Sequence, residues 1–129
     1  MQLLFTEISH DIKISVQPVF VESDSDVIRK KFIYAYYVMI ENLGNKPVKL
    51  LSRYWKIMDS TGEVNEVEGD GVIGRQPRIE PGSSHRYNSY CVLKSMKGSM
   101  KGFYTMEKDN GDYIKVRIPE FLLRSHLLN

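Results

Sequence analysis

The sequence predicts an all-β protein, a sandwich of about seven strands in a single domain. Apolar and polar residues alternate with a period of two, as at Ile12, Ile14 and Val16, which is the spacing of a half-buried strand. No segment has the wider apolar spacing of an amphipathic helix. Clusters of glycine, proline, asparagine and aspartate separate the apolar runs at regular intervals, a pattern typical of β-sandwiches.

Three strands are expected in the first half of the chain. The first runs from Ile12 to Val21, and Pro18 within it indicates a sheet edge or a bulge, because proline has no backbone N–H to donate. Residues 32–40 are apolar or aromatic at odd and even positions alike, which predicts a central strand covered on both faces. Residues 48–59 form the third strand and carry Trp55, which is expected in the core between two sheets.

The second half of the chain predicts four further strands, at residues 63–69, 85–93, 98–108 and 113–118. Asn110-Gly111 lies between the last two and is a preferred hairpin turn. Pro119 is expected to end the last strand. The apolar tail, residues 120–129, is expected to dock on the sheet without forming a helix.

A tandem repeat, SMKGSMKG, covers residues 95–102. On a strand its period of four places Met96, Gly98, Met100 and Gly102 on one face. The two glycines are expected to let a bulky side chain or another backbone approach closely.

Length and composition indicate a folded domain that needs no disulfide. The chain has 129 residues, of which 42% are hydrophobic and 26% charged, and this is enough to bury a core. The net charge of +2 is too balanced to indicate nucleic-acid binding. Charged residues interrupt every apolar run before the length of a membrane span, so no membrane insertion is expected.

The N-terminus and the single cysteine predict a cytoplasmic protein. The opening segment, residues 1–13, lacks the basic region and apolar stretch of a secretory signal. Cys91 cannot form an intrachain disulfide and suits a reducing compartment. Its apolar neighbours indicate a buried structural thiol, although a reactive thiol is the alternative.

The segment EGDGVIGRQP, residues 68–77, spells the glycine pattern of a dinucleotide-binding loop at Gly69, Gly71 and Gly74. In that motif the third glycine opens a helix whose N-terminus faces the pyrophosphate. Pro77 prevents such a helix, and no βαβ unit surrounds the glycines. A structural loop is therefore expected. The alternative is weaker anion binding by its backbone amides, with Arg75 and Arg78 close by.

Candidate metal-ligating and catalytic residues are few. The three histidines, His10, His85 and His126, have no chelating spacing. Five acids gather in one region, Asp59, Glu63, Glu66, Glu68 and Asp70, but strand alternation distributes them over two faces. No nucleophile elbow or paired-acid arrangement stands out. We expect no metal, no cofactor and no enzymatic activity, and a metal sensor at the acidic hairpin is the open alternative.

Several segments together carry a family resemblance. The combination RYW, GxGVxGxQPxxxPG, GxMxGxYxM and IPxF, spread from about Ile12 to Leu123, closely resembles the ApaG family. The resemblance implies a fibronectin type III-like or immunoglobulin-like sandwich, and the family's glycine motif corresponds to Gly69, Gly71 and Gly74. One departure is Tyr90, where the family commonly has glycine.

The resemblance also implies a function class. The bacterial family carries the label of a cobalt and magnesium efflux-associated protein, and similar domains appended to eukaryotic proteins look like protein-interaction modules. We therefore expect a non-enzymatic protein that binds an unidentified protein partner through residues 69–78, with no nucleic acid and with a homodimer left open. The alternative is a small-anion or nucleotide binder at the same loop.

Overall fold

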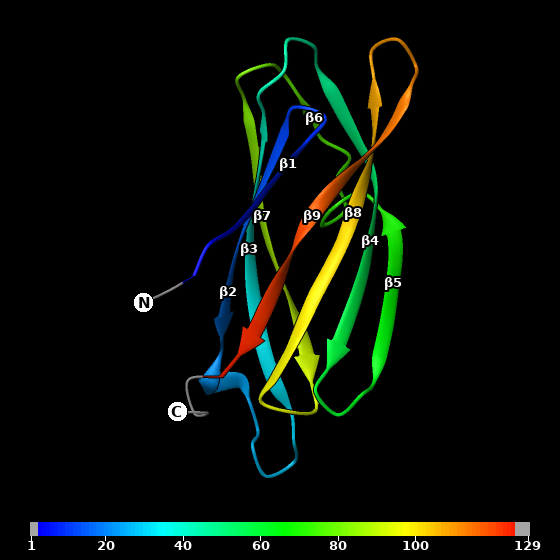
Figure 1. Cartoon of the computed structure of the whole chain (residues 1–129). Helices are drawn as coiled ribbons and strands as arrows, with labels where there is room; N and C mark the ends of the chain where they lie inside the picture. The colour runs from blue at the N-terminus through cyan, green and yellow to red at the C-terminus, as the bar shows by residue number, and fades with distance from the viewer. Residues whose placement is uncertain (1–2, 126–129) are drawn as a thin grey trace.

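The computed structural model describes residues 3–125 and consists of two antiparallel sheets packed face to face (Figure 1). The first sheet has the order β1 (Phe5–Ser9), β2 (Ile12–Phe20), β3 (Phe32–Asn42) and β7 (Ser84–Leu93). The second has the order β5 (Val64–Asp70), β4 (Val48–Asp59), β8 (Lys97–Lys108) and β9 (Tyr113–Arg124), with short β6 (Arg78–Ile79) pairing with the start of β4. A 3₁₀ turn, η1 (Glu22–Asp24), follows β2. Among the described residues no helix is long and apolar enough to span a membrane.

The inward faces of both sheets form one apolar cluster, and this confirms the predicted all-β sandwich. Trp55 lies at its centre and is 3% exposed. Its ring contacts those of Tyr36, Tyr104 and Phe121, with ring centroids 5.3, 6.5 and 5.8 Å away. Burial of aromatic rings at these distances is a large contribution to folding stability. The prediction that Trp55 lies between the sheets is confirmed.

Two strands, β1 and β6, were not predicted from the sequence. β1 pairs with β2 from Phe5 opposite Val16 to Ser9 opposite Ile12. Its partly buried face carries Phe5 and Glu7, whereas Ile8 is 56% exposed, so the apolar alternation that reveals a strand is missing. The pairing of β2 with β1 ends at Val16. Pro18 therefore lies on a free edge of β2, as expected for a residue without an N–H.

The prediction that Pro119 ends the last strand is wrong. β9 continues to Arg124, and the register with β8 shifts there: Gly102 pairs with Ile118, but Met100 pairs with Phe121. One extra residue on β9 makes this a β-bulge, a position that tolerates proline. The predicted docked tail is therefore strand as far as Arg124, and residues 126–129 lie outside the described range.

The prediction that residues 32–40 are covered on both faces is also wrong. Burial alternates along β3, so that Tyr34, Tyr36 and Val38 point into the core. On the opposite face Tyr37 is 49% exposed. The apolar residues of both parities therefore reflect a core face and an open apolar face, which sequence composition does not distinguish.

The glycines of the tandem repeat permit the close approach expected of them. A Cβ at Gly102 would lie 2.9 Å from the carbonyl carbon of Tyr54 and closer still to its oxygen. A Cβ at Gly98 would lie 2.8 Å from the Leu93 side chain. Met100, on the same face, is fully buried. The alternation predicted for this strand is confirmed for Gly98, Met100 and Gly102, whereas Met96 lies in the bend before β8 and packs against the core from there.

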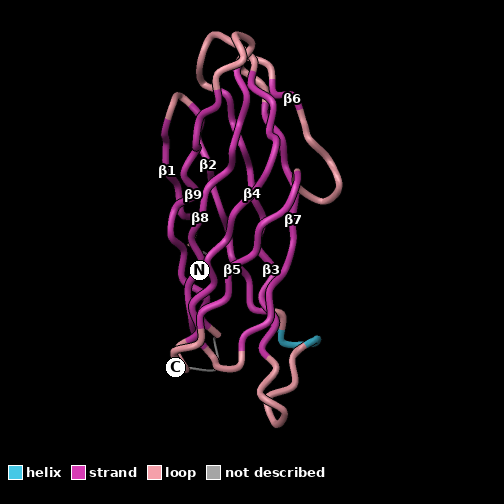
Figure 2. The backbone as a smooth tube through the Cα atoms, turned by 90° about the vertical axis from the view of Figure 1, so that its right-hand side faces the viewer, coloured by secondary structure: helices cyan, strands magenta, loops and turns pink. Residues whose placement is uncertain are grey.

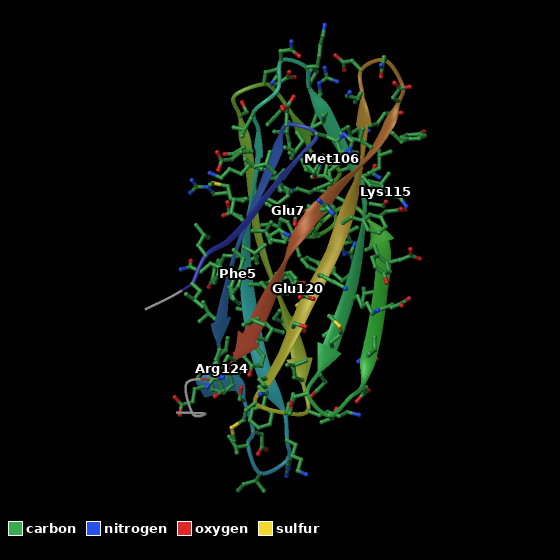
Figure 3. All side chains as sticks on the ribbon, viewed as in Figure 1. Phe5, Glu7, Met106, Lys115, Glu120 and Arg124 are labelled. Carbon is green, nitrogen blue, oxygen red and sulfur yellow. The ribbon has the colours of Figure 1, made fainter. Side chains whose placement is uncertain are left out.

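The two long sides of the sandwich are closed in different ways. On one side β1, with Glu7 on it, passes β9 (Figure 3). Glu7 and Arg117 form a 2.8 Å ion pair there, and the Ser9 hydroxyl oxygen accepts a hydrogen bond from the Arg117 amide. On the other side the segment between β5 and β6 leaves the edge of β4 and returns to it, because both strands pair with β4 in the second sheet. Val72 within this segment is 1% exposed, and the segment contains the last two glycines of the motif.

Candidate functional site

The glycine motif folds into a tight hairpin, which we call the glycine hairpin and define as residues 71–77. Val72 and Arg75 exchange backbone hydrogen bonds of 2.8 and 3.1 Å. The two residues between them, Ile73 and Gly74, both have positive φ angles, 49° and 73°, as in a type I′ turn. The chain then runs through Pro77 into β6 and opens no helix.

At each glycine of the motif a side chain would clash with its surroundings or strain the backbone. Gly71 has a φ of 64°, and a Cβ there would lie 2.9 Å from the Arg75 carbonyl carbon. Gly74 occupies the second positive-φ position of the turn. Gly69 leaves room for Arg53, whose Nη1 would lie 2.9 Å from a Cβ at that position. The same Nη1 donates to the carbonyls of Asp70 and Gly71 at 3.1 and 2.9 Å.

The hairpin is anchored on a β-bulge in β4. Leu51 is the extra residue of that bulge, where the register between β4 and β8 shifts. Its carbonyl accepts the Gly71 amide at 2.8 Å and the side-chain amide of Gln76 at 2.9 Å, while the Leu50 amide donates to Pro77. These bonds fix where the tip of the hairpin lies.

Ile73 is the unusual residue of the hairpin. A β-branched side chain at positive φ is sterically unfavourable, and asparagine or glycine is the ordinary occupant of this turn position. Ile73 is nevertheless 62% exposed, whereas its neighbour Val72 is buried in the core. The turn therefore holds a strained, apolar side chain out in solvent.

The tip of the hairpin forms one wall of a groove on the outer face of the first sheet. Figure 2 shows the loop before β6 standing out from the sandwich on the side of β7. The groove has a volume of about 710 Å³ and is lined by Val21, Asp24, Lys31, Ile33, Ala35, Ile73, Asn88, Ser89, Tyr90 and Val92. We call it the β3–β7 groove. Tyr90 and Val92 on its floor are 67% and 46% exposed.

The opposite wall of the groove comes from the connection between β2 and β3. Asp26 and Lys31 pair their backbones there, and Ile28 at the tip of this second hairpin is 94% exposed. The connection extends past the end of the sandwich (Figure 1). The β3–β7 groove thus lies between two hairpins that each expose an isoleucine.

The titratable groups that face inward from β7 and β8 are protonated. The hydroxyls of Tyr87 and Tyr104 are hydrogen-bonded to each other, and burial raises the pKa of both. Burial raises the pKa of the Cys91 thiol to about 12, and Cys91 is 7% exposed. The prediction of a buried thiol is confirmed, and at neutral pH neither tyrosine nor thiol is ionised.

The predicted anion-binding residues are only partly available to a ligand. The amides of Gly71, Val72 and Arg75 already donate within the protein. Arg78 is held by ion pairs of 3.1 Å to Glu80 and to Asp109. The Arg75 side chain is exposed, and burial and the positive charge of Arg75 lower the pKa of His85. Anion binding by this loop therefore stays a prediction that would rest chiefly on Arg75.

Asp59, the first acid of the acidic hairpin, is held by hydrogen bonds from its own turn and from the connection between β7 and β8. Asp59 is 8% exposed and accepts bonds from the Lys94 amide at 2.6 Å, the Thr61 amide at 3.1 Å and the Ser95 hydroxyl. Across residues 3–125 no three His, Cys, Asp or Glu side chains gather in a way that could hold a metal ion. His126 lies outside this range.

The sequence prediction missed Ile73 and the floor of the groove. The β3 part of the floor was predicted to be covered on both faces, so its open outer face was not anticipated. One signal was present in the sequence Gly-Val-Ile-Gly. In a hairpin with two residues at its turn, the consecutive apolar residues cannot both point into the core.

Comparison with known proteins gives a consistent family match. The profile of the ApaG domain family matches residues 22–108. The protein ApaG of Agrobacterium fabrum is 42% identical over 122 residues, which is 95% of this chain and 94% of that protein. The protein ApaG of Salmonella arizonae is 44% identical over 110 residues, covering 85% of this chain and 88% of that one.

Solved structures agree with the same match. The crystal structure of a putative ApaA protein from Bordetella pertussis superposes with a TM-score of 0.88 at 40% identity, covering 90% of this chain and 94% of that one. A protein from Archaeoglobus fulgidus gives a TM-score of 0.55 at 12% identity over 93% of this chain and 97% of that one, which is a likeness of fold alone.

Proposed function

The chain belongs to the ApaG domain family, and from this premise we propose that it is a non-enzymatic protein-binding module. Its partner, another protein, docks in the β3–β7 groove and contacts the tip of the glycine hairpin. Any influence on cobalt or magnesium efflux acts through that partner. The module works in the cytoplasm, where its single buried thiol needs no disulfide partner.

The conformation and exposure of Ile73 carry this proposal. A left-handed conformation costs a β-branched residue about 1–2 kcal/mol. Exposure of an apolar side chain gives up the stabilisation that burial would provide. The fold needs neither, because asparagine or glycine would form the same turn. A contact with a partner accounts for both costs, since the side chain is then buried when the complex forms.

The rest of the groove supports the same function. Tyr90 and Val92 expose apolar area beside Ile73, and tyrosine is enriched at protein interfaces because it combines a large apolar ring with a polar hydroxyl. The floor lies on β3 and β7, which pair with each other along their length. A groove on a rigid sheet binds with a low entropic cost of ordering.

The substitution Ile73→Asn tests the proposal without risking the fold. We expect the free energy of unfolding to rise by about 1 kcal/mol, because asparagine tolerates positive φ. Partner binding is expected to fall. A photo-crosslinking residue in place of Val92 would capture the partner in cells, followed by mass spectrometry of the crosslinked proteins.

The matched control is Leu122→Asn, which changes a side chain that is 56% exposed on the outer face of the other sheet. Crosslinks from position 92 should disappear in Ile73→Asn and persist in Leu122→Asn. The proposal fails if Ile73→Asn leaves the crosslinked proteins unchanged. It also fails if a crosslinker placed at Leu122 captures the same proteins with equal yield.

A further inference from the structure

This inference rests on the proposed function and concerns the chemistry of the partner. Three bases lie near the groove. Lys31 in the β2–β3 hairpin lines it, Arg86 on β7 lines the neighbouring hollow, and Arg75 lies two residues after Ile73 in the glycine hairpin, where its charge acts on His85, the neighbour of Arg86. All three are exposed, and none forms an ion pair within residues 3–125. Asp24 is the one acid among the residues lining the groove.

The bases stand at the two ends of the apolar floor. Lys31 precedes Phe32, which pairs with Leu93, and Arg86 pairs with Met39 at the other end of the strand pair. From Leu93 to Arg86 the strand advances seven residues, about 23 Å at roughly 3.3 Å per residue. Arg86 lines a second hollow next to the groove, and Asn88 lines both. The floor therefore fits an extended segment of about seven residues.

A second copy of this chain is a poor occupant for electrostatic reasons. A two-fold symmetric dimer brings the same face to both sides of the interface. In such a dimer Lys31 of one copy lies opposite either Lys31 or Arg86 of the other, so like charges meet at both ends. Like charges placed together across an interface oppose association.

We propose that the β3–β7 groove binds an extended segment of another protein with an aliphatic or aromatic centre and acidic residues at both ends. The apolar centre covers Ile73, Tyr90 and Val92. The acidic residues face Lys31 at one end and Arg75 and Arg86 at the other. The acids set orientation and association rate, while the apolar contacts supply most of the affinity.

The probe is a phage-displayed library of random linear twelve-residue peptides, selected against the full chain at low salt. Enriched peptides are expected to carry Asp or Glu on both sides of an apolar core. The double substitution Arg75→Glu, Arg86→Glu should weaken the best peptide about tenfold, because each exposed charge pair is worth less than about 1 kcal/mol. The control Lys101→Glu, a charge reversal on the outer face of the other sheet, should leave affinity unchanged.

Other outcomes separate this inference from the proposed function. If the enriched peptides are neutral or basic but their binding still depends on Ile73, the proposed charge complementarity is overturned. Protein binding in the groove would still be supported. A failure to enrich any peptide would overturn the proposal that the groove binds an extended segment. Crosslinking from position 92 would then still decide whether a protein docks in the groove. A concentration-dependent dimer in sedimentation, abolished by Ile73→Asn, would assign the groove to a second copy and overturn the inference.

Discussion

Gly102→Ala is expected to destabilise the fold severely, because β8 lies against β4 with no room for a methyl group. A Cβ at this position would lie 2.9 Å from the carbonyl carbon of Tyr54 and 3.2 Å from the Cα of Trp55. Ordinary van der Waals contact begins at 3.4 Å. The two strands must therefore separate by more than about 0.5 Å, at a point where they are hydrogen-bonded neighbours 4.7–4.9 Å apart.

The expected cost follows from this geometry. Overpacking a core typically costs about 1–3 kcal/mol, and here the obstacle is backbone, which cannot change rotamer. We expect a loss of about 3 kcal/mol in the free energy of unfolding. With a urea dependence of about 1.5 kcal/mol per molar, the unfolding midpoint would fall by about 2 M.

Gly111→Ala provides the comparison. Gly111 has a φ of 87° and nothing within 4 Å of its would-be Cβ, so its cost is that of backbone strain alone, about 1 kcal/mol. Urea unfolding followed by Trp55 fluorescence measures both variants. The urea midpoints of the two variants are expected to differ by about 1.3 M. A difference smaller than about 0.5 M would refute the close-approach argument.

Three further outcomes are expected. Burial opposes ionisation of Asp59, but hydrogen bonds from Ser95, the Lys94 amide and Thr61 outweigh it and lower the pKa of the carboxyl below its ordinary value of 3.8. Its stabilisation is therefore present above pH 3.8 and lost as the pH falls through the lowered pKa. Asp59→Asn should cost about 2 kcal/mol at pH 7, and the difference from wild type in urea unfolding should shrink below pH 3.8; a constant difference would contradict this. Cys91, with its pKa raised to about 12 by burial, should react with a thiol reagent at pH 8 only when urea unfolds the chain; rapid reaction of the native protein would show that the thiol is accessible. Titration calorimetry with pyrophosphate at millimolar concentration should give no heat, because the amides of Gly71, Val72 and Arg75 already donate within the protein; heat that Arg75→Ala removes would favour the anion-binding alternative.

Most of the sandwich could be predicted because its signals are local. The alternation of Met100 and Gly102 on the inner face of β8 follows directly from the two-residue period of a strand. Pro119 shows where this reasoning fails. Proline without an N–H usually ends a ladder, yet here β9 itself accommodates Pro119 through a bulge and continues its pairing with β8. Whether a partner strand can shift register is a property of the pairing, which no local pattern contains.

The candidate site was predicted only in part for the same reason. The sequence marks residues 69–78 as a turn, and Pro77 excludes a helix after it. It does not indicate that Val72 enters the core while Ile73 stands out beside Tyr90. Ile73 and Tyr90 come from separate parts of the chain and line the same groove because the glycine hairpin is hydrogen-bonded to Leu51.

The sequence by itself determined seven of the strands, the inward residues of most of them and the turn at the glycine motif, because these depend on periodicity and backbone preference within a few residues. Only the tertiary structure decided that the apolar residues of β3 divide between a core face and an open face. The reason is that burial depends on which elements cover a strand, and the residues of a strand do not specify which elements will pack against it. The groove between the two exposed isoleucines is a consequence of that packing.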